Sequence, residues 1–287
     1  YFIPVIISLG VIGNIFSLMV FLGTHMRRRS FSVYLASIAI ADTGFLLSLS
    51  LTWLEYVNVN VFHSSGWCQL AIYLSYVSSF LSVWFVVSFT VERYIAVCHP
   101  LKRPAMCTAE RAWNVVFGLS LLAAAAYSVT LWTSGIAEVD GILGDTYYVC
   151  TPLKKYMAVH NALTYVDSVH TLLVPFVTII VLNSRIAIRA RGRPTLCSKA
   201  QLQVTKMLLI SSSLFLLINT PSYVLRVRNQ VLAVLNCQES VHDQQFQMLL
   251  QQIFQLIYYS NFALNFVVYS ICSSKFRQAF IRFWRQM

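Results

Sequence analysis

One apolar stretch with two distinctive ends constrains the fold of this chain more than any other feature. It begins at Cys68, contains no charged side chain, and ends at Glu92-Arg93. As an α-helix, this stretch would be roughly 37 Å long, which exceeds the ~30 Å hydrocarbon core of a bilayer. The stretch therefore predicts a membrane-spanning helix with a cysteine near one surface and a Glu-Arg pair near the other.

Further apolar segments of similar length recur along the whole chain. The sequence is 57% hydrophobic and only 11% charged, whereas soluble domains carry about 25% charged residues. We therefore expect an all-α membrane protein, a single seven-helix domain over residues 1–287. The predicted spans are 1–23, 32–56, 67–98, 111–136, 160–188, 203–233 and 245–272.

The basic residues predict the orientation of these spans. Arg93, the loops 24–31 and 99–111, the segment 185–206 and the tail hold 17 of the 21 Lys and Arg. Because Lys and Arg are enriched on the cytoplasmic side, these segments are expected inside and the N-terminus outside. Anionic membrane lipids then account for the net charge of +11, and no nucleic-acid partner is needed.

The tail differs in pattern from the spans before it. Over 274–286, Phe276, Phe280 and Phe283 fall on one helical face and basic residues nearer the other. This pattern predicts an amphipathic helix that lies on the inner membrane surface.

Several landmarks recur in a specific order along the spans. Together they resemble the rhodopsin-like (class A) family of G-protein-coupled receptors over essentially the whole chain. The landmarks are Asn14, Asp42, Cys68, Glu92-Arg93-Tyr94, Pro100, Cys150, Pro175, Phe215, Pro221, Asn265 and Tyr269. The resemblance implies a receptor in the plasma membrane, and not an enzyme.

Asp42 is an ionisable residue inside a predicted span, which is a functional hypothesis by default because its burial is costly. In the family, the matching aspartate binds sodium together with a serine and polar side chains of span seven. The resemblance implies that Asp42, Ser82, Asn261 and Asn265 form such a site. The alternative is a protonated Asp42 within a packed polar cluster. No other cofactor is expected.

The resemblance also assigns the inner end to G-protein coupling. In the family the arginine that matches Arg93 is neutralised by its neighbouring acid at rest and meets the G-protein on activation. Arrestin and receptor kinases are expected as further partners. The coupling residues are expected to be Glu92, Arg93, Tyr94, Pro100, Leu101, Lys206 and Tyr269.

Some positions depart from the commonest family pattern. Asn219 occupies the place of a span-six tryptophan, Asn183 that of a span-five tyrosine, and Phe266 that of the span-seven proline. Gln201 occupies the place of an acid that the family carries near the inner end of span six. These variants resemble peptide-receptor branches, notably invertebrate FMRFamide-receptor-like proteins.

An outer cavity is expected to bind the ligand. Ser75 replaces the aspartate that anchors monoamines in this family. All lysines fall in loops or at span ends, so none is available for retinal. Aromatic walls with a few polar groups suit short peptides. The expected lining is Trp53, Glu55, Tyr76, Ser79, Asp167, Asn219, Tyr223, Arg226, Gln252, Gln255 and Tyr259.

The loop 137–159 is expected to cover this cavity. Residues 146–149 favour a strand, so a β-hairpin is predicted, and the resemblance implies a disulfide between Cys68 and Cys150. The sequence thus predicts a neuropeptide receptor. Two alternatives stay open: a class A receptor for a lipid or another small molecule, and a transporter, although neither inverted repeats nor broken spans are visible.

Overall fold

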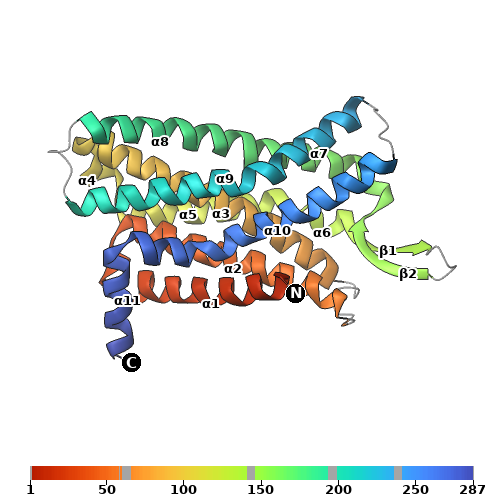
Figure 1. The fold of residues 1–287 in the computed structure, drawn as a ribbon, viewed down its shortest axis with the longest axis horizontal. Helices are drawn as coiled ribbons and strands as arrows, with labels where there is room; N and C mark the ends of the chain where they lie inside the picture. Colours follow the sequence, from red (N-terminus) through yellow and green to blue (C-terminus); the bar gives the residue numbers. More distant parts are fainter. Residues whose placement is uncertain are drawn as a thin grey trace.

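The computed structural model describes residues 2–57, 59, 66–140, 146–192, 199–235 and 241–286, and most of them are helical. The long helices lie side by side as one bundle (Figure 1). They are α1 (Phe2–Gly23), α2 (Ser30–Tyr56), α3 (Trp67–Cys98), α5 (Ala109–Tyr127), α7 (Met157–Ser168), α8 (Val174–Gly192), α9 (Lys199–Leu235), α10 (Val241–Cys272) and α11 (Ser274–Gln286).

Shorter elements connect these helices. At one end of the bundle lie η1 (His25–Arg28), η2 (Pro100–Lys102) and α4 (Arg103–Met106). Towards the other end lie α6 (Thr130–Thr133), the strands β1 (Ser134–Asp140) and β2 (Thr146–Pro152), and η3 (Lys154–Tyr156). The two strands form one antiparallel hairpin, with Ser134 opposite Pro152 and Asp140 opposite Thr146.

The helices are long and apolar enough for a membrane protein. Among the described residues, six helical segments meet the length and hydropathy needed to cross a bilayer, and a seventh does if the bent pair 245–272 and 276–284 is included. The prediction of a seven-helix membrane protein with a β-hairpin is therefore confirmed.

Several predicted span limits differ from the observed helices. The fourth span was predicted to reach residue 136, but its helix ends at Thr133 and Ser134 begins β1. The cause is tertiary, since the backbone of 134–136 pairs with 150–152 and Cys150 is fixed to α3. The helices of spans five, six and seven begin earlier than predicted, at Met157, Lys199 and Val241.

Proline shapes the helix of span five. α7 passes into α8 through one π-helical turn, Val169–Leu173, directly before Val174-Pro175. A proline ring has no N–H and clashes with the preceding turn, and a single wide turn relieves this conflict. The His170 carbonyl of that turn accepts a 3.0 Å hydrogen bond from Trp84 Nε1 of α3.

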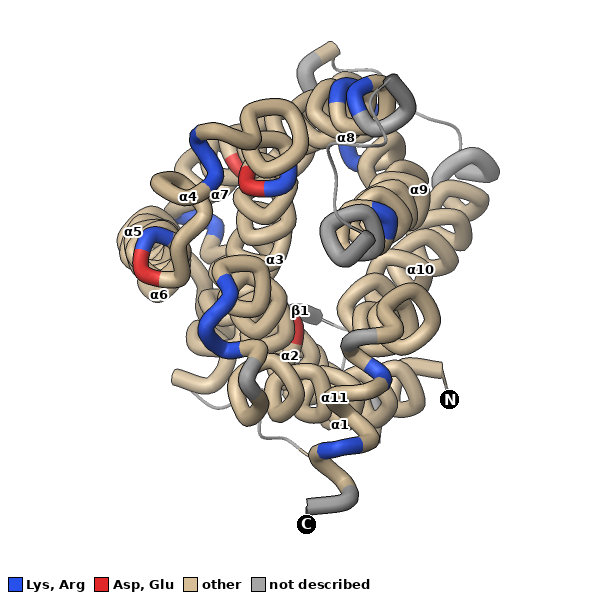
Figure 2. The backbone as a smooth tube through the Cα atoms, turned by 90° about the vertical axis from the view of Figure 1, so that its left-hand side faces the viewer, with Lys and Arg blue, Asp and Glu red and all other residues tan. Residues whose placement is uncertain are grey.

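The two ends of the bundle differ in chemistry. The hairpin lies at one end, which we call the hairpin end, and α11 lies at the other, turned by 96° from α10 (Figure 1). Lys and Arg gather around α4, α8, α9 and α11 at this second end, which we call the basic end (Figure 2). This is the charge asymmetry expected of a protein with one cytoplasmic face.

Close helix packing connects α1, α10 and α11 at the basic end. A Cβ atom at Gly13 would meet the Phe266 side chain at 2.9 Å, so this approach of α1 to α10 requires a glycine. Phe21, Tyr269 and Phe276 are each 1% exposed and form ring contacts with one another. α11 is thereby packed against the bundle through its aromatic face.

Candidate functional site

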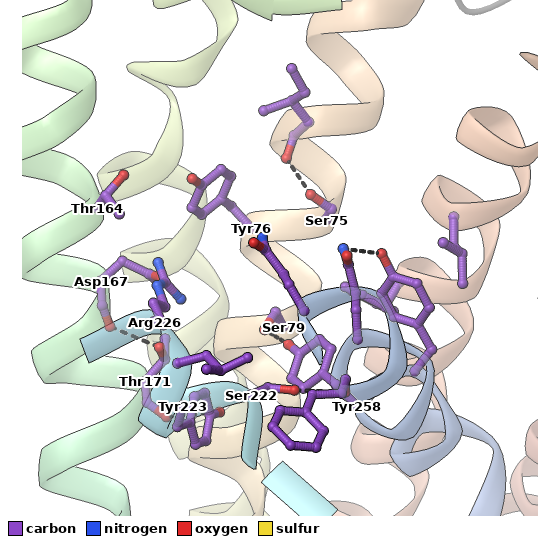
Figure 3. Close-up of a pocket in the computed structure, with 18 of the residues that line it drawn as sticks. Ser75, Tyr76, Ser79, Thr164, Asp167, Thr171, Ser222, Tyr223, Arg226 and Tyr258 are labelled. Atoms are coloured by element: carbon purple, nitrogen blue, oxygen red, sulfur yellow. Dashed lines mark hydrogen bonds and ion pairs between the residues drawn. The ribbon is translucent and has the colours of Figure 1, made fainter. Parts of the chain in front are cut away.

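A cavity of about 770 Å³ lies between the helices in the half of the bundle nearer the hairpin. Side chains of α2, α3, α7, α9 and α10 line it, with Thr171 from the π-helical turn (Figure 3). The lining mixes aromatic rings with hydroxyl and carboxamide groups, and this composition is typical of sites for small polar ligands.

Most predicted cavity residues line this space, but not all. Those that line it are Tyr76, Ser79, Asp167, Tyr223, Arg226, Gln255 and Tyr259. Three others, Trp53, Asn219 and Gln252, are not among its lining residues. The side chain of Glu55 lies outside the described part of the structure.

Asn219 misses the cavity because its side chain turns into the helix bundle. It is completely buried, and its Nδ2 donates a 2.6 Å hydrogen bond to the Phe215 carbonyl of the same helix. Gln252 is exposed on α10. On this helix the lining side chains include Gln251, Gln255 and Tyr258, one and two turns apart.

An ion pair crosses the cavity from α7 to α9. Arg226 Nη2 donates to Asp167 Oδ2 at 2.6 Å, and the Tyr127 hydroxyl of α5 donates to Asp167 Oδ1 at 2.7 Å. Asp167 is 6% exposed, so both oxygens of a buried carboxylate are bonded. Charges removed from water are stable only when they are paired and hydrogen-bonded in this way.

Tyr258 is a central lining residue that the sequence analysis missed. Its hydroxyl is 2.8 Å from Ser79 Oγ of α3, and its ring contacts Phe45 and Tyr223. Figure 3 shows it between the helices, facing Ser79. The spacing from Gln255, three residues earlier on the same helical face, was the signal available in the sequence.

Asp42 lies deeper in the bundle and is completely buried. It accepts a 2.6 Å hydrogen bond from Ser82 Oγ and a 2.5 Å hydrogen bond from Asn265 Nδ2. Asn261 of the predicted set is also buried, one turn before Asn265 on α10. Three helices thus contribute oxygen-bearing side chains to one small polar cluster, which is the donor chemistry that a hard cation prefers.

Arg93 forms an ion pair with Glu92 at the basic end, and both residues are buried. The guanidinium carbon also lies 5.6 Å from the Phe31 ring centroid and 5.7 Å from that of Phe89. Arg93 Nε is buried without a hydrogen-bond partner. The arginine is therefore held by one acid and two aromatic faces. Another acceptor could take the place of Glu92.

The other residues assigned to the basic end differ in exposure. Pro100 and Lys206 are exposed and Leu101 is 96% exposed, whereas Tyr269 is buried in the core of the bundle. Tyr94 contacts His99, with 3.4 Å between its hydroxyl and His99 Nε2. Of this set, the exposed residues are the ones that a protein partner would reach directly.

The hairpin is tied to the bundle by the predicted disulfide, which the structure contains between Cys68 and Cys150. Cys68 lies in the first turn of α3 and Cys150 near the end of β2. The Leu153 N–H donates to the Thr133 carbonyl at 2.9 Å, so the end of the hairpin is also bonded to the helix before it.

Comparison with known proteins agrees with this arrangement. The family model of the 7 transmembrane receptor (rhodopsin family) matches residues 13–269. The thyrotropin-releasing hormone receptor of Gallus gallus is 28% identical over 96% of this chain and 75% of its own length. The FMRFamide receptor of Drosophila melanogaster is 26% identical over 95% of this chain and 51% of its own length.

A third relative covers more of its own length. The B1 bradykinin receptor of Macaca fascicularis is 26% identical over 99% of this chain and 82% of that protein. The expected resemblance to class A receptors, with an FMRFamide receptor among them, is therefore confirmed. The family model covers most of the seven-helix bundle, including Asp42 and Arg93. This chain belongs to the rhodopsin family of seven-transmembrane receptors.

Proposed function

We propose that the cavity binds a short extracellular neuropeptide and that binding activates a heterotrimeric G-protein at the basic end. The observation that carries the proposal is the cavity itself, which measures about 770 Å³ and is lined by aromatic, hydroxyl and carboxamide side chains. Such a space suits a few peptide residues. The names of three relatives, which refer to a hormone, FMRFamide and bradykinin, support a peptide ligand.

The charge asymmetry between the two ends supports one orientation of the chain in the plasma membrane. The hairpin end and the N-terminus would be extracellular, and the basic end would face the cytoplasm and its anionic lipids. α11 would lie along the inner leaflet, since its Phe280 and Trp284 rings contact Phe16 of α1 while Arg277 and Arg282 are exposed. Arrestin and receptor kinases would act at the same face.

Population shift is the mechanism that we propose for signalling. A peptide that binds the active arrangement of helices better than the resting one would move the equilibrium by its difference in affinity. α9, which contains Pro221 in its interior, would swing at its basic end. Arg93 would then exchange Glu92 for the G-protein, with Tyr94, Pro100, Leu101, Lys206 and Tyr269 forming or supporting the contact surface.

The Asp42 cluster fits a bound sodium ion as a modulator of this equilibrium. Its carboxylate, the Ser82 hydroxyl and the side-chain oxygens of Asn261 and Asn265 would hold the ion. The ion would supply a positive charge that compensates Asp42 in the resting bundle. Loss of the sodium effect on agonist affinity in Asp42→Asn, without loss of surface expression, would test this site.

The peptide receptor function can be tested in cells that express the chain. Pools of short peptides should activate G-protein nucleotide exchange through the wild-type protein. They should still bind to Arg93→Ala without activating it, and Glu110→Gln, an exposed acid of α5, serves as the control. Activation by lipids alone would contradict the peptide ligand, and full activation through Arg93→Ala would contradict the mechanism.

A further inference from the structure

The contacts of the Arg93 guanidinium come from two different helices. Glu92 is its neighbour in the chain and Phe89 lies one turn earlier, so both belong to α3, as Arg93 does. Phe31 belongs to α2, and its ring centroid is 5.6 Å from the guanidinium carbon. Among the ion-pair and cation–π contacts of the described residues, the Phe31 ring is therefore the one that joins Arg93 to a second helix.

The Phe31 ring is held in place at the start of α2. Phe31 is the second residue of this helix, is 7% exposed and belongs to the same buried cluster as Met26. Hydrogen bonds fix the backbone around it, since the Arg29 N–H donates to the Met26 carbonyl and the Ser32 N–H donates to the Arg29 carbonyl, both at 3.0 Å. The ring thus forms a fixed surface beside the Arg93 side chain.

Burial strengthens the attraction between Arg93 and this ring. Cation–π contacts are stronger where water is excluded from the charge, and Arg93 is only 6% exposed. Its Nε is buried without a hydrogen-bond partner, so Glu92 does not satisfy the whole guanidinium group. Arg29 also lies 6.0 Å from the Phe31 ring, but it is exposed and its attraction is weakened by solvent.

The contact is specific to the position in which Arg93 is paired with Glu92. A guanidinium that extends from the bundle towards a protein partner leaves the Phe31 ring behind, because this ring belongs to α2. Phe89, in contrast, moves together with α3. An attraction that exists in only one of two arrangements favours that arrangement by its full free energy.

We propose that Phe31 is a positioning residue, which retains Arg93 beside Glu92 through cation–π attraction and so limits signalling without ligand. This inference rests on the proposed function, since it takes Arg93 to be the residue that meets the G-protein. It adds a restraint that acts from α2 and that depends on the electrons of an aromatic ring.

The test replaces Phe31 by phenylalanines that carry one, two or three ring fluorines. Fluorine withdraws electron density from the ring face, which attracts the cation, and changes the shape of the ring little. Basal nucleotide exchange on a purified G-protein should rise with each added fluorine. Phe31→Leu, which has no ring, should raise it about fivefold. Phe31→Tyr keeps the ring and should stay well below Phe31→Leu.

The same fluorinated series at Phe85 is the matched control. Phe85 is also buried, at 2% exposure, and among the described residues no cation lies over its ring. Fluorination of Phe85 should therefore leave basal exchange at the wild-type level. Melting temperatures in detergent give a second readout, which needs no G-protein. Fluorination of Phe31 should lower the melting temperature of the wild type but not that of Arg93→Gln, which has no cation to lose.

The possible results separate the inference from the function on which it rests. If the wild type with peptides produces no nucleotide exchange, the proposed function fails and the role of Phe31 in signalling fails with it. If the wild type signals but the fluorinated Phe31 series is flat, only the inference is overturned. It is equally overturned if Phe31→Tyr and Phe31→Leu have the same effect, because the side chain would then act through packing alone.

Discussion

Asn183 Nδ2 donates a 2.7 Å hydrogen bond to Ser212 Oγ and so joins α8 to α9 in the half of the bundle nearer the basic end. Ser212 in turn donates to the Leu208 carbonyl of its own helix. Asn183 Oδ1 is buried without a partner. The pair is therefore a directional contact between α8 and α9, the helix that we propose to swing on activation.

Breaking this contact should raise activity without ligand. A hydrogen bond of this kind contributes about 1 kcal/mol, so Ser212→Ala should increase the active population up to roughly fivefold. Basal nucleotide exchange on a purified G-protein measures this directly. Ser213→Ala, one position along α9 and exposed, is the matched control. Equal basal exchange in both variants would rule out the Asn183–Ser212 bond as a resting restraint.

The Glu92–Arg93 ion pair predicts a second increase in basal activity. Glu92→Gln removes the buried negative charge that neutralises Arg93, while the Phe31 and Phe89 rings remain against the guanidinium. The freed arginine should engage the G-protein more readily, so basal exchange should rise several-fold. Glu110→Gln should have no effect. A fall in basal exchange at equal expression would mean that the pair positions Arg93 for activation.

The seven spans were readable from the sequence because their physical cause is local. An apolar run of about 20 residues with few charges has few alternatives to a helix that crosses a bilayer. The end of the fourth span was not readable in this way. Residues 134–136 are uncharged, like the helix before them, and they become a strand because a partner strand, fixed through Cys150, takes up their backbone hydrogen bonds.

The cavity lining was only partly readable because it depends on helix rotation and on pairing between distant residues. Asp167 and Arg226 were each expected to face the ligand, but the bond between them joins positions 59 residues apart. Asn219 was expected in the cavity from the helical spacing of span six, but its side chain bonds to the Phe215 carbonyl. On α10, a rotation by one residue separates the predicted Gln252 from the observed Gln251.

Asp42 predicts a difference between two substitutions at one position. Asp42→Ala removes the acceptor for Ser82 and Asn265, and leaving buried donors unsatisfied costs about 1–3 kcal/mol. Its melting temperature in detergent should therefore fall below that of the wild type. Asp42→Asn keeps an acceptor oxygen but no charge, so it should lose less stability and all of the sodium dependence. Equal melting temperatures for the two variants would contradict the importance of these hydrogen bonds.

The Cys68–Cys150 disulfide joins two residues that are 82 positions apart in the sequence, and it links the hairpin covalently to α3. Cys150→Ser should destabilise the hairpin end by about 2–5 kcal/mol, chiefly because the unfolded chain regains freedom. Peptide affinity should fall with it, since β1 and β2 would no longer be fixed near the cavity. Thermal unfolding with and without a reductant measures the first effect, and ligand binding measures the second.

The reductant separates the disulfide from other effects of the substitution. Reduction should lower the melting temperature of the wild type but leave Cys150→Ser unchanged, because that variant has no bond to lose. Cys272→Ser, which changes a free cysteine of α10, should behave like the wild type in both conditions. If reduction destabilised Cys150→Ser as much as the wild type, the loss would have to arise elsewhere than at the bond between α3 and the hairpin.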